Sequence, residues 1–120
     1  MYQIFNILDR PIVLDKKATE YCETTGKLFS VKDYCELIPR HFKNVKDIWV
    51  TLRSDPEITD YEKVVFEAVV DDDDLDGILR REAEFYIEAY SQIPLEILKE
   101  FVLTVRIHHA KIKITMGSHA

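Results

Sequence analysis

The chain has 120 residues and a formal net charge of −6, from 16 Lys and Arg against 22 Asp and Glu. Hydrophobic residues make up 47% and charged residues 32%, a composition that is typical of globular proteins and argues against a disordered chain. The negative charge disfavours nucleic acid as a partner, and no apolar stretch reaches the roughly 18 residues that a membrane-spanning helix needs.

We expect one domain over residues 1–116, because a chain of this length has room for one hydrophobic core. Residues 117–120, which read GSHA, are small and polar, and we interpret them as a disordered tail or a cloning remnant. The two cysteines, Cys22 and Cys35, show no C-x-x-C spacing, and no signal-peptide pattern is present. These features predict a cytoplasmic protein with reduced thiols.

The first half of the chain predicts one strand and two helices. Residues 1–8 form a short apolar run that we interpret as a strand, although periodicity alone does not separate it from a helix. Residues 15–26 predict a short helix that ends at its glycine. A second helix is predicted over residues 30–45, where Ser30 opens a pattern like a capping box and Pro39 should kink or divide the helix.

The second half has clearer periodicity. Apolar and polar residues alternate along two runs within residues 47–70, and the turn residues between them predict an antiparallel pair of strands. Residues 75–93 repeat apolar side chains at helical spacing, which predicts an amphipathic helix packed on the sheet. Residues 101–107 and 110–116 alternate again and predict two further strands.

The resulting order of elements, β-α-β-β-α-β, matches a ferredoxin-like plait. We therefore predict an α+β fold in which an antiparallel sheet of about four to five strands carries helices on one face. An extra N-terminal helix and an extra C-terminal strand complete the prediction. Many unrelated functions use this plait, so the fold by itself does not indicate a function.

Five aspartates lie within six positions at the start of the predicted helix of residues 75–93, four of them before it and Asp76 within it. Asp72, Asp74 and Asp76, with the glycine that follows, match the first half of an EF-hand calcium loop. The second half of the pattern fails, because the twelfth position counted from Asp72 is Ala83, where the loop needs a bidentate carboxylate. A divalent-metal site on these three aspartates is therefore the less favoured hypothesis.

The favoured interpretation of the same residues is structural. Aspartates accept hydrogen bonds from the unpaired amides at a helix start and interact favourably with its dipole, each contributing about 0.3 to 1 kcal/mol. Asp72, Asp73 or Asp74 would then be the cap of the predicted helix, and the other carboxylates would be solvated.

The sequence predicts no catalytic residue and no cofactor. His108 and His109 are adjacent in a predicted strand, where successive side chains point to opposite faces, so the pair is poorly placed to chelate one metal ion. Cys35 and His41 lie six residues apart, a poor spacing for a thiol and its base. Phosphate-binding and nucleophile-elbow motifs are absent, and we lean against an enzyme.

What remains is the surface of the predicted helix over residues 75–93. Several of its apolar side chains fall at or beyond the edge of the predicted core stripe, so they would contact either the first helices or a partner. The predicted partner-binding residues are Asp72, Asp73, Asp74, Phe85, Tyr86 and Tyr90.

The leading hypothesis is a small acidic cytosolic protein that acts by protein–protein interaction, as an accessory, regulatory or neutralising subunit. It would bind a protein partner or associate with itself, using the acidic loop and exposed sheet edges. Two alternatives stay open: a small divalent-metal-dependent enzyme that uses the acidic loop, and a dimeric small-molecule binding module.

Overall fold

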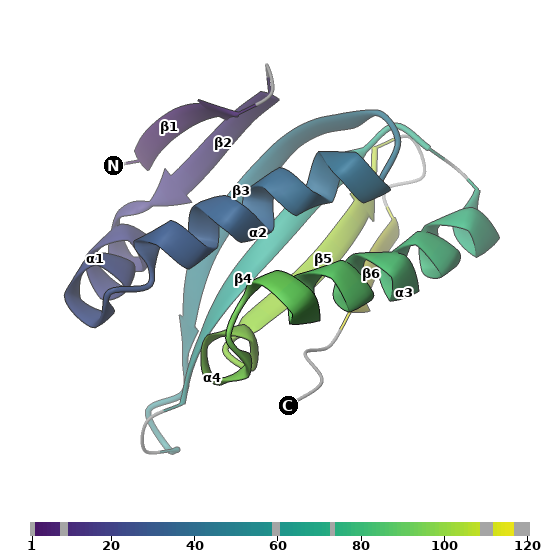
Figure 1. Cartoon of the computed structure of the whole chain (residues 1–120). Helices are drawn as coiled ribbons and strands as arrows, with labels where there is room; N and C mark the ends of the chain where they lie inside the picture. Colours follow the sequence, from purple (N-terminus) through teal and green to yellow (C-terminus); the bar gives the residue numbers. More distant parts are fainter. Residues whose placement is uncertain (1, 8–9, 59–60, 73, 109–111, 117–120) are drawn as a thin grey trace.

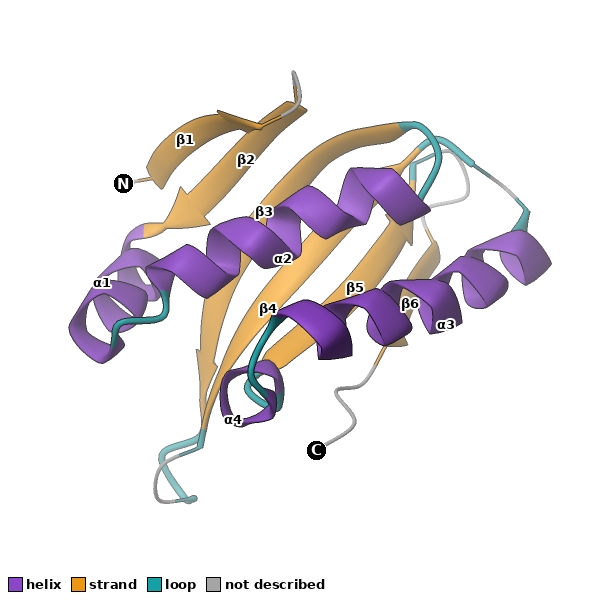
Figure 2. Ribbon diagram, in the orientation of Figure 1, coloured by secondary structure: helices purple, strands orange, loops and turns teal. Residues whose placement is uncertain are grey.

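The chain folds into a mixed β-sheet with helices on one of its faces (Figures 1 and 2). The computed structural model describes residues 2–7, 10–58, 61–72, 74–108 and 112–116. Residues 2–7, 10, 11 and 112–116 are described through their backbone alone. The elements are, in chain order, β1 (Tyr2–Ile7), β2 (Arg10–Asp15), α1 (Lys16–Thr25), α2 (Leu28–His41), β3 (Val45–Ser54), β4 (Glu62–Val70), α3 (Leu75–Gln92), α4 (Leu95–Leu98), β5 (Phe101–Ile107) and β6 (Ile112–Met116).

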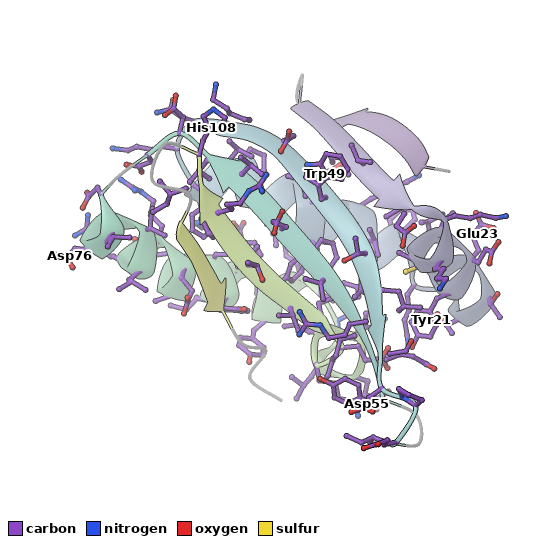
Figure 3. The ribbon with its side chains drawn as sticks, turned by 180° about the vertical axis from the view of Figure 1, so that it is seen from behind. Tyr21, Glu23, Trp49, Asp55, Asp76 and His108 are labelled. Carbon is purple, nitrogen blue, oxygen red and sulfur yellow. The ribbon has the colours of Figure 1, made fainter. Side chains whose placement is uncertain are left out.

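The six described strands lie in the sheet in the order in which they occur in the chain. β2 pairs parallel with β3, and β4 pairs parallel with β5, while the other neighbouring strands are antiparallel. The first parallel pair is connected through α1 and α2, and the second through α3 and α4. These two crossovers place all four helices on the same face, which leaves the opposite face open (Figure 3).

The α+β class is therefore confirmed, but the ferredoxin-like plait is not. In a split β-α-β arrangement the two strands joined by a helix are separated by a third strand. Here they are direct neighbours, and the sheet is mixed rather than antiparallel. The described sheet also has more strands than predicted, because β2 was not recognised in the sequence.

The sequence pattern did not predict β2, because the strand has only six residues and includes Pro11, which cannot donate a hydrogen bond to a ladder. The register shows how the proline is tolerated. Pro11 pairs with Asn6 of β1, whereas the ladder between β2 and β3 is formed by Ile12–Leu14 alone. The proline therefore lies outside the part of β2 that has neighbours on both sides.

The first two helices agree only partly with the prediction. α1 ends at Gly26, whose φ of 72° is the left-handed conformation that favours glycine, as predicted. The start of α2 was predicted wrongly, because the helix begins at Leu28 and Ser30 lies inside it. Pro39 does not divide α2: it lies in the last turn, where the missing donor affects one intrahelical bond.

The core lies between the sheet and the two long helices. Ile48 and Val50 of β3 are fully buried on the helix side, whereas Thr51 and Arg53 are exposed on the other face, as their alternation predicts. An aromatic cluster joins the layers, because the ring of Tyr34 from α2 lies 4.3 to 5.1 Å from three phenylalanine rings. These rings belong to Phe66 of β4, Phe85 of α3 and Phe101 of β5.

Candidate partner-binding surface

The acidic loop before α3 forms the N-terminal cap of that helix. Asp74 is the cap residue, and its Oδ1 accepts a hydrogen bond from the backbone N–H of Gly77 at 3.0 Å. A Cβ at Gly77 would collide with the Asp74 carboxylate, so a larger residue there would displace this cap. Asp72 accepts the backbone N–H of Asp74 and forms an ion pair with Arg81 at 3.1 Å, which ties the loop to the second turn of the helix.

These contacts bear on the metal hypothesis. The carboxylates of Asp72 and Asp74 are already engaged by backbone amides and by Arg81, and Asp76 lies in the first turn of α3. Within the ranges that the structure describes, no group of three or more His, Cys, Asp or Glu side chains could hold a metal ion together. Asp73 and His109 lie outside the described residues. The described geometry thus favours the capping interpretation.

Two of the predicted partner-binding residues belong to the core. Phe85 is 0% exposed and Tyr86 is 5% exposed, so the prediction that they contact a partner is wrong for this structure. The Phe85 ring lies between α2 and the sheet, 5.0 Å from the ring of Tyr34 and 6.0 Å from those of His41 and Phe42. The apolar side chains of α3 cover a wider part of the helix circumference than the sheet can bury. The side that packs against α2 is buried.

The outward side of the same arc carries exposed apolar side chains. Leu75 and Leu79, which belong to the apolar repeat of this helix, are 43% and 51% exposed, Tyr90 is 41% exposed, and Ile87 is 72% exposed. Leu75, Leu79 and Tyr90 recur at spacings that place them on one side of a helix, with Ile87 beside them. In Figures 1 and 2 the outer side of α3 has no other helix beside it, whereas α2 lies along its inner side.

We name this surface, formed by Leu75, Leu79, Ile87 and Tyr90, the α3 outer surface. Sequence periodicity alone did not identify two of its leucines, because nothing in the spacing tells which half of a wide apolar arc is covered. The signal that could have indicated an exposed apolar side was the width of the apolar arc of α3, which exceeds what one helix usually buries against a sheet. Tyr90, by contrast, is accessible as predicted, and its role in binding stays a prediction.

The formal net charge of the chain comes from the segment that contains this surface. Residues 71–92 contain eight carboxylates and two arginines, while the rest of the chain contains fourteen acidic and fourteen basic residues. The net charge of −6 therefore belongs entirely to the acidic loop and α3. Figure 3 shows Asp76 at the start of this helix, at one end of the molecule.

A second carboxylate cluster holds α3 against α2. Glu88 Oε1 lies 2.7 Å from Nε2 of His41, and Glu88 Oε2 lies 2.7 Å from Nη2 of Arg40. Gln92 donates a further hydrogen bond to the same carboxylate at 3.0 Å. The hydrogen bond with His41 and the charge of Arg40 hold the pKa of Glu88 below its ordinary value. Because these contacts fix the inner side of α3, they orient its outer surface.

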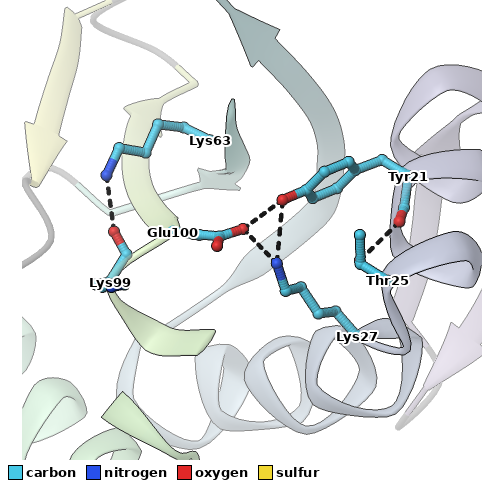
Figure 4. Close-up of polar contacts among 6 residues, drawn as sticks. All are labelled: Tyr21, Thr25, Lys27, Lys63, Lys99 and Glu100. Atoms are coloured by element: carbon cyan, nitrogen blue, oxygen red, sulfur yellow. Dashed lines mark hydrogen bonds and ion pairs between the residues drawn. The ribbon is translucent and has the colours of Figure 1, made fainter. Parts of the chain in front are cut away.

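The other conspicuous polar cluster lies near the opposite end of the sheet (Figure 4). Lys27 Nζ lies 2.6 Å from Oε1 of Glu100 and donates to the hydroxyl of Tyr21 at 3.0 Å, while that hydroxyl donates to Glu100 at 2.6 Å. Burial opposes ionisation of Glu100, but the hydrogen bonds from Lys27 and Tyr21 outweigh it and hold the pKa of its carboxyl below the ordinary value. No local pattern in the sequence predicts this cluster, since 73 or more positions separate Glu100 from the other two residues.

We interpret the Tyr21, Lys27 and Glu100 cluster as structural. It joins α1 and the turn before α2 to the residue that precedes β5, and each of its polar groups has a partner within the cluster. Burial, followed by the hydrogen bond to Glu100, raises the pKa of the Tyr21 phenol, so the hydroxyl stays protonated. A partly buried charge with matched partners stabilises one arrangement of the chain and does not by itself indicate catalysis.

The open face of the sheet is less apolar at its surface than the α3 outer surface. Val65, Val69 and Val102 lie on this face but are only 3 to 8% exposed. A shallow hollow of about 300 Å³ over β3 and β4 is lined by Trp49, Thr51, Arg53, Val65 and Glu67. Its lining mixes one aromatic ring with charged groups, so the part of this face whose side chains are described does not present a continuous apolar patch.

None of the helices that the structure describes is both long enough and apolar enough to cross a membrane. No family model, curated protein or solved structure was found to match the chain. The functional argument therefore rests on the side chains themselves.

Proposed function

We propose that the chain acts by binding another protein, as an accessory, regulatory or neutralising subunit, and that the α3 outer surface is the contact. The observation that carries this proposal is that four exposed apolar side chains lie on α3, in the segment 71–92 whose formal charge equals the net charge of the chain. Apolar area supplies affinity when it is removed from water, and surrounding charge selects the partner and speeds association.

Charge complementarity specifies the occupant. The acidic loop and α3 together carry a formal net charge of −6, although Glu88 of this segment faces α2. They attract a partner whose contact residues combine Lys or Arg with apolar side chains. An amphipathic basic helix meets both requirements, because it can lay its apolar side along Leu75, Leu79 and Tyr90 while its cations face the acidic loop. Two copies of α3 would instead bring like charges together.

A synthetic amphipathic peptide of Lys and Leu tests the proposal directly, with a Glu and Leu peptide of the same pattern as its control. Fluorescence anisotropy of the labelled peptides is expected to show binding of the basic peptide only, with an affinity that falls as salt rises. The double variant Leu79→Gln with Ile87→Gln should bind about tenfold or more weakly, because it removes apolar contact while glutamine preserves the helix.

The matched control is Phe29→Gln. Phe29 lies on α2 and is 79% exposed, so the change removes a comparable apolar side chain outside the proposed surface. The control should bind like the unmodified protein. Equal binding of the acidic peptide, or equal losses in the Phe29 variant and the α3 variant, would contradict the assignment of this surface.

A further inference from the structure

The strand β1 is an edge of the sheet, with β2 on one side and no described strand on the other. An edge strand presents unpaired backbone N–H and C=O groups that can pair with another strand. Natural proteins usually protect such edges with charged residues, proline or bulges. The other edge of this sheet follows that rule, because β6 contains Lys113.

β1 contains none of these protective features. Its sequence, YQIFNI, has no charged residue, no proline and no glycine, whereas each of the other described strands contains at least one charged residue. Its pairing with β2 runs in unbroken register from Tyr2 to Ile7, so no bulge turns the edge away. Three of its first four residues are Tyr, Ile and Phe, which are residue types that favour strands.

We propose that β1 pairs antiparallel with β1 of a second copy of this chain, which joins the two sheets edge to edge. Antiparallel pairing of identical strands is self-complementary about a two-fold axis, so the same segment serves both copies. Because this axis is perpendicular to the sheet, the residue at the centre of the join faces its own counterpart. In the register centred on Ile4, Gln3 faces Phe5 of the second copy, and no charged residues meet at the join.

The distribution of charge supports a second copy as the occupant. In Figure 1, α3 and the acidic loop lie near β5 and β6, at the edge of the sheet opposite β1. With strands spaced about 4.8 Å apart, β5 of one copy and β5 of the other would be separated by about 40 Å across the joined sheet. This distance is several times the Debye length of about 8 to 10 Å in physiological salt, so the two charged regions would not repel each other appreciably.

This inference is independent of the proposed contact at α3. It concerns the opposite edge of the sheet, and a dimer joined at β1 would leave both α3 outer surfaces accessible. Loss of one property by mutation should therefore leave the other unchanged, which separates the two proposals experimentally.

The test is the mass of the protein in solution, measured by light scattering after size-exclusion chromatography at concentrations up to about 1 mM, the range of weak interfaces. We expect a dimer. Ile4→Lys should be a monomer, because the two lysines at the centre of the join lie opposite one another across the two-fold axis, and Ile4→Glu should be a monomer for the same reason. Mixing the two variants should restore a dimer, since each lysine then faces a glutamate.

The mixing experiment also excludes misfolding as the cause of dissociation, because two misfolded variants would not recover the native mass together. Thr51→Lys, on the open face of the sheet, is the control and should remain a dimer. A wild-type monomer at every concentration would overturn the proposal. So would a dimer that survives both charged β1 variants or that is lost in Thr51→Lys alone.

Discussion

Replacement of Phe85 by alanine tests the orientation of α3 that the structure assigns. The side chain is fully buried and lies near four other aromatic rings, so its removal leaves a cavity between α2, α3 and the sheet. A buried Phe→Ala change costs about 3 to 5 kcal/mol. For 120 residues the entropy of unfolding is about 0.25 kcal/mol per kelvin, so Tm should fall by about 12 to 20 °C.

Urea denaturation followed by circular dichroism measures this loss, with Ile87→Ala as the matched control two residues along the same helix. Ile87 is 72% exposed, and its truncation should change the free energy of unfolding by less than about 0.5 kcal/mol. An equally small loss of unfolding free energy in Phe85→Ala, or the larger loss in Ile87→Ala, would refute the assigned orientation of α3 and indicate that Phe85 is exposed.

Other substitutions and reagents probe the cap of α3, the cluster of Tyr21, Lys27 and Glu100, and the two thiols. Asp74→Ala removes the N-cap bond of α3 and should lower the free energy of unfolding by about 1 kcal/mol in urea titrations, whereas Asp74→Asn should retain most of it. Because the folded-state pKa of Glu100 is lowered, its ionised form stabilises the protein above the unfolded pKa of about 4.3, and this stability is lost as pH falls through the folded pKa. The difference in stability between the wild type and Glu100→Gln should therefore be constant near neutral pH and shrink below about pH 4; a difference that persists unchanged in acid would count against the ion pair with Lys27. Burial raises the pKa of Cys22 to about 11 and that of Cys35 further, so both thiols should react with iodoacetamide only after denaturation, and rapid labelling of the native protein would contradict their burial.

Much of the secondary structure follows from local patterns. The alternation in β3, β4 and β5 predicts strands because successive side chains point to opposite faces. The left-handed conformation at Gly26 and the cap at Asp74 are decided by a few neighbouring residues, so both could be located without knowing the fold.

The arrangement of those elements was not available from the same patterns. Alternation shows that a strand is half-buried but does not name its neighbour, so the order β-α-β-β-α-β fitted both a split plait and the observed sequential sheet. The pairings of β2 with β3 and of β4 with β5 depend on how the helices pack across them. β2 itself becomes evident only when its partners on both sides are in place.

The candidate surface shows the same division. From the sequence alone, α3 is an amphipathic helix that starts in an acidic cap and has more apolar residues than one narrow stripe requires. Only the packing of α2 beside it, through His41 and the Glu88 carboxylate, decides that Phe85 is buried and Leu79 is exposed. Helical periodicity fixes which side chains share a side, and contacts between residues distant in the chain fix which side meets water.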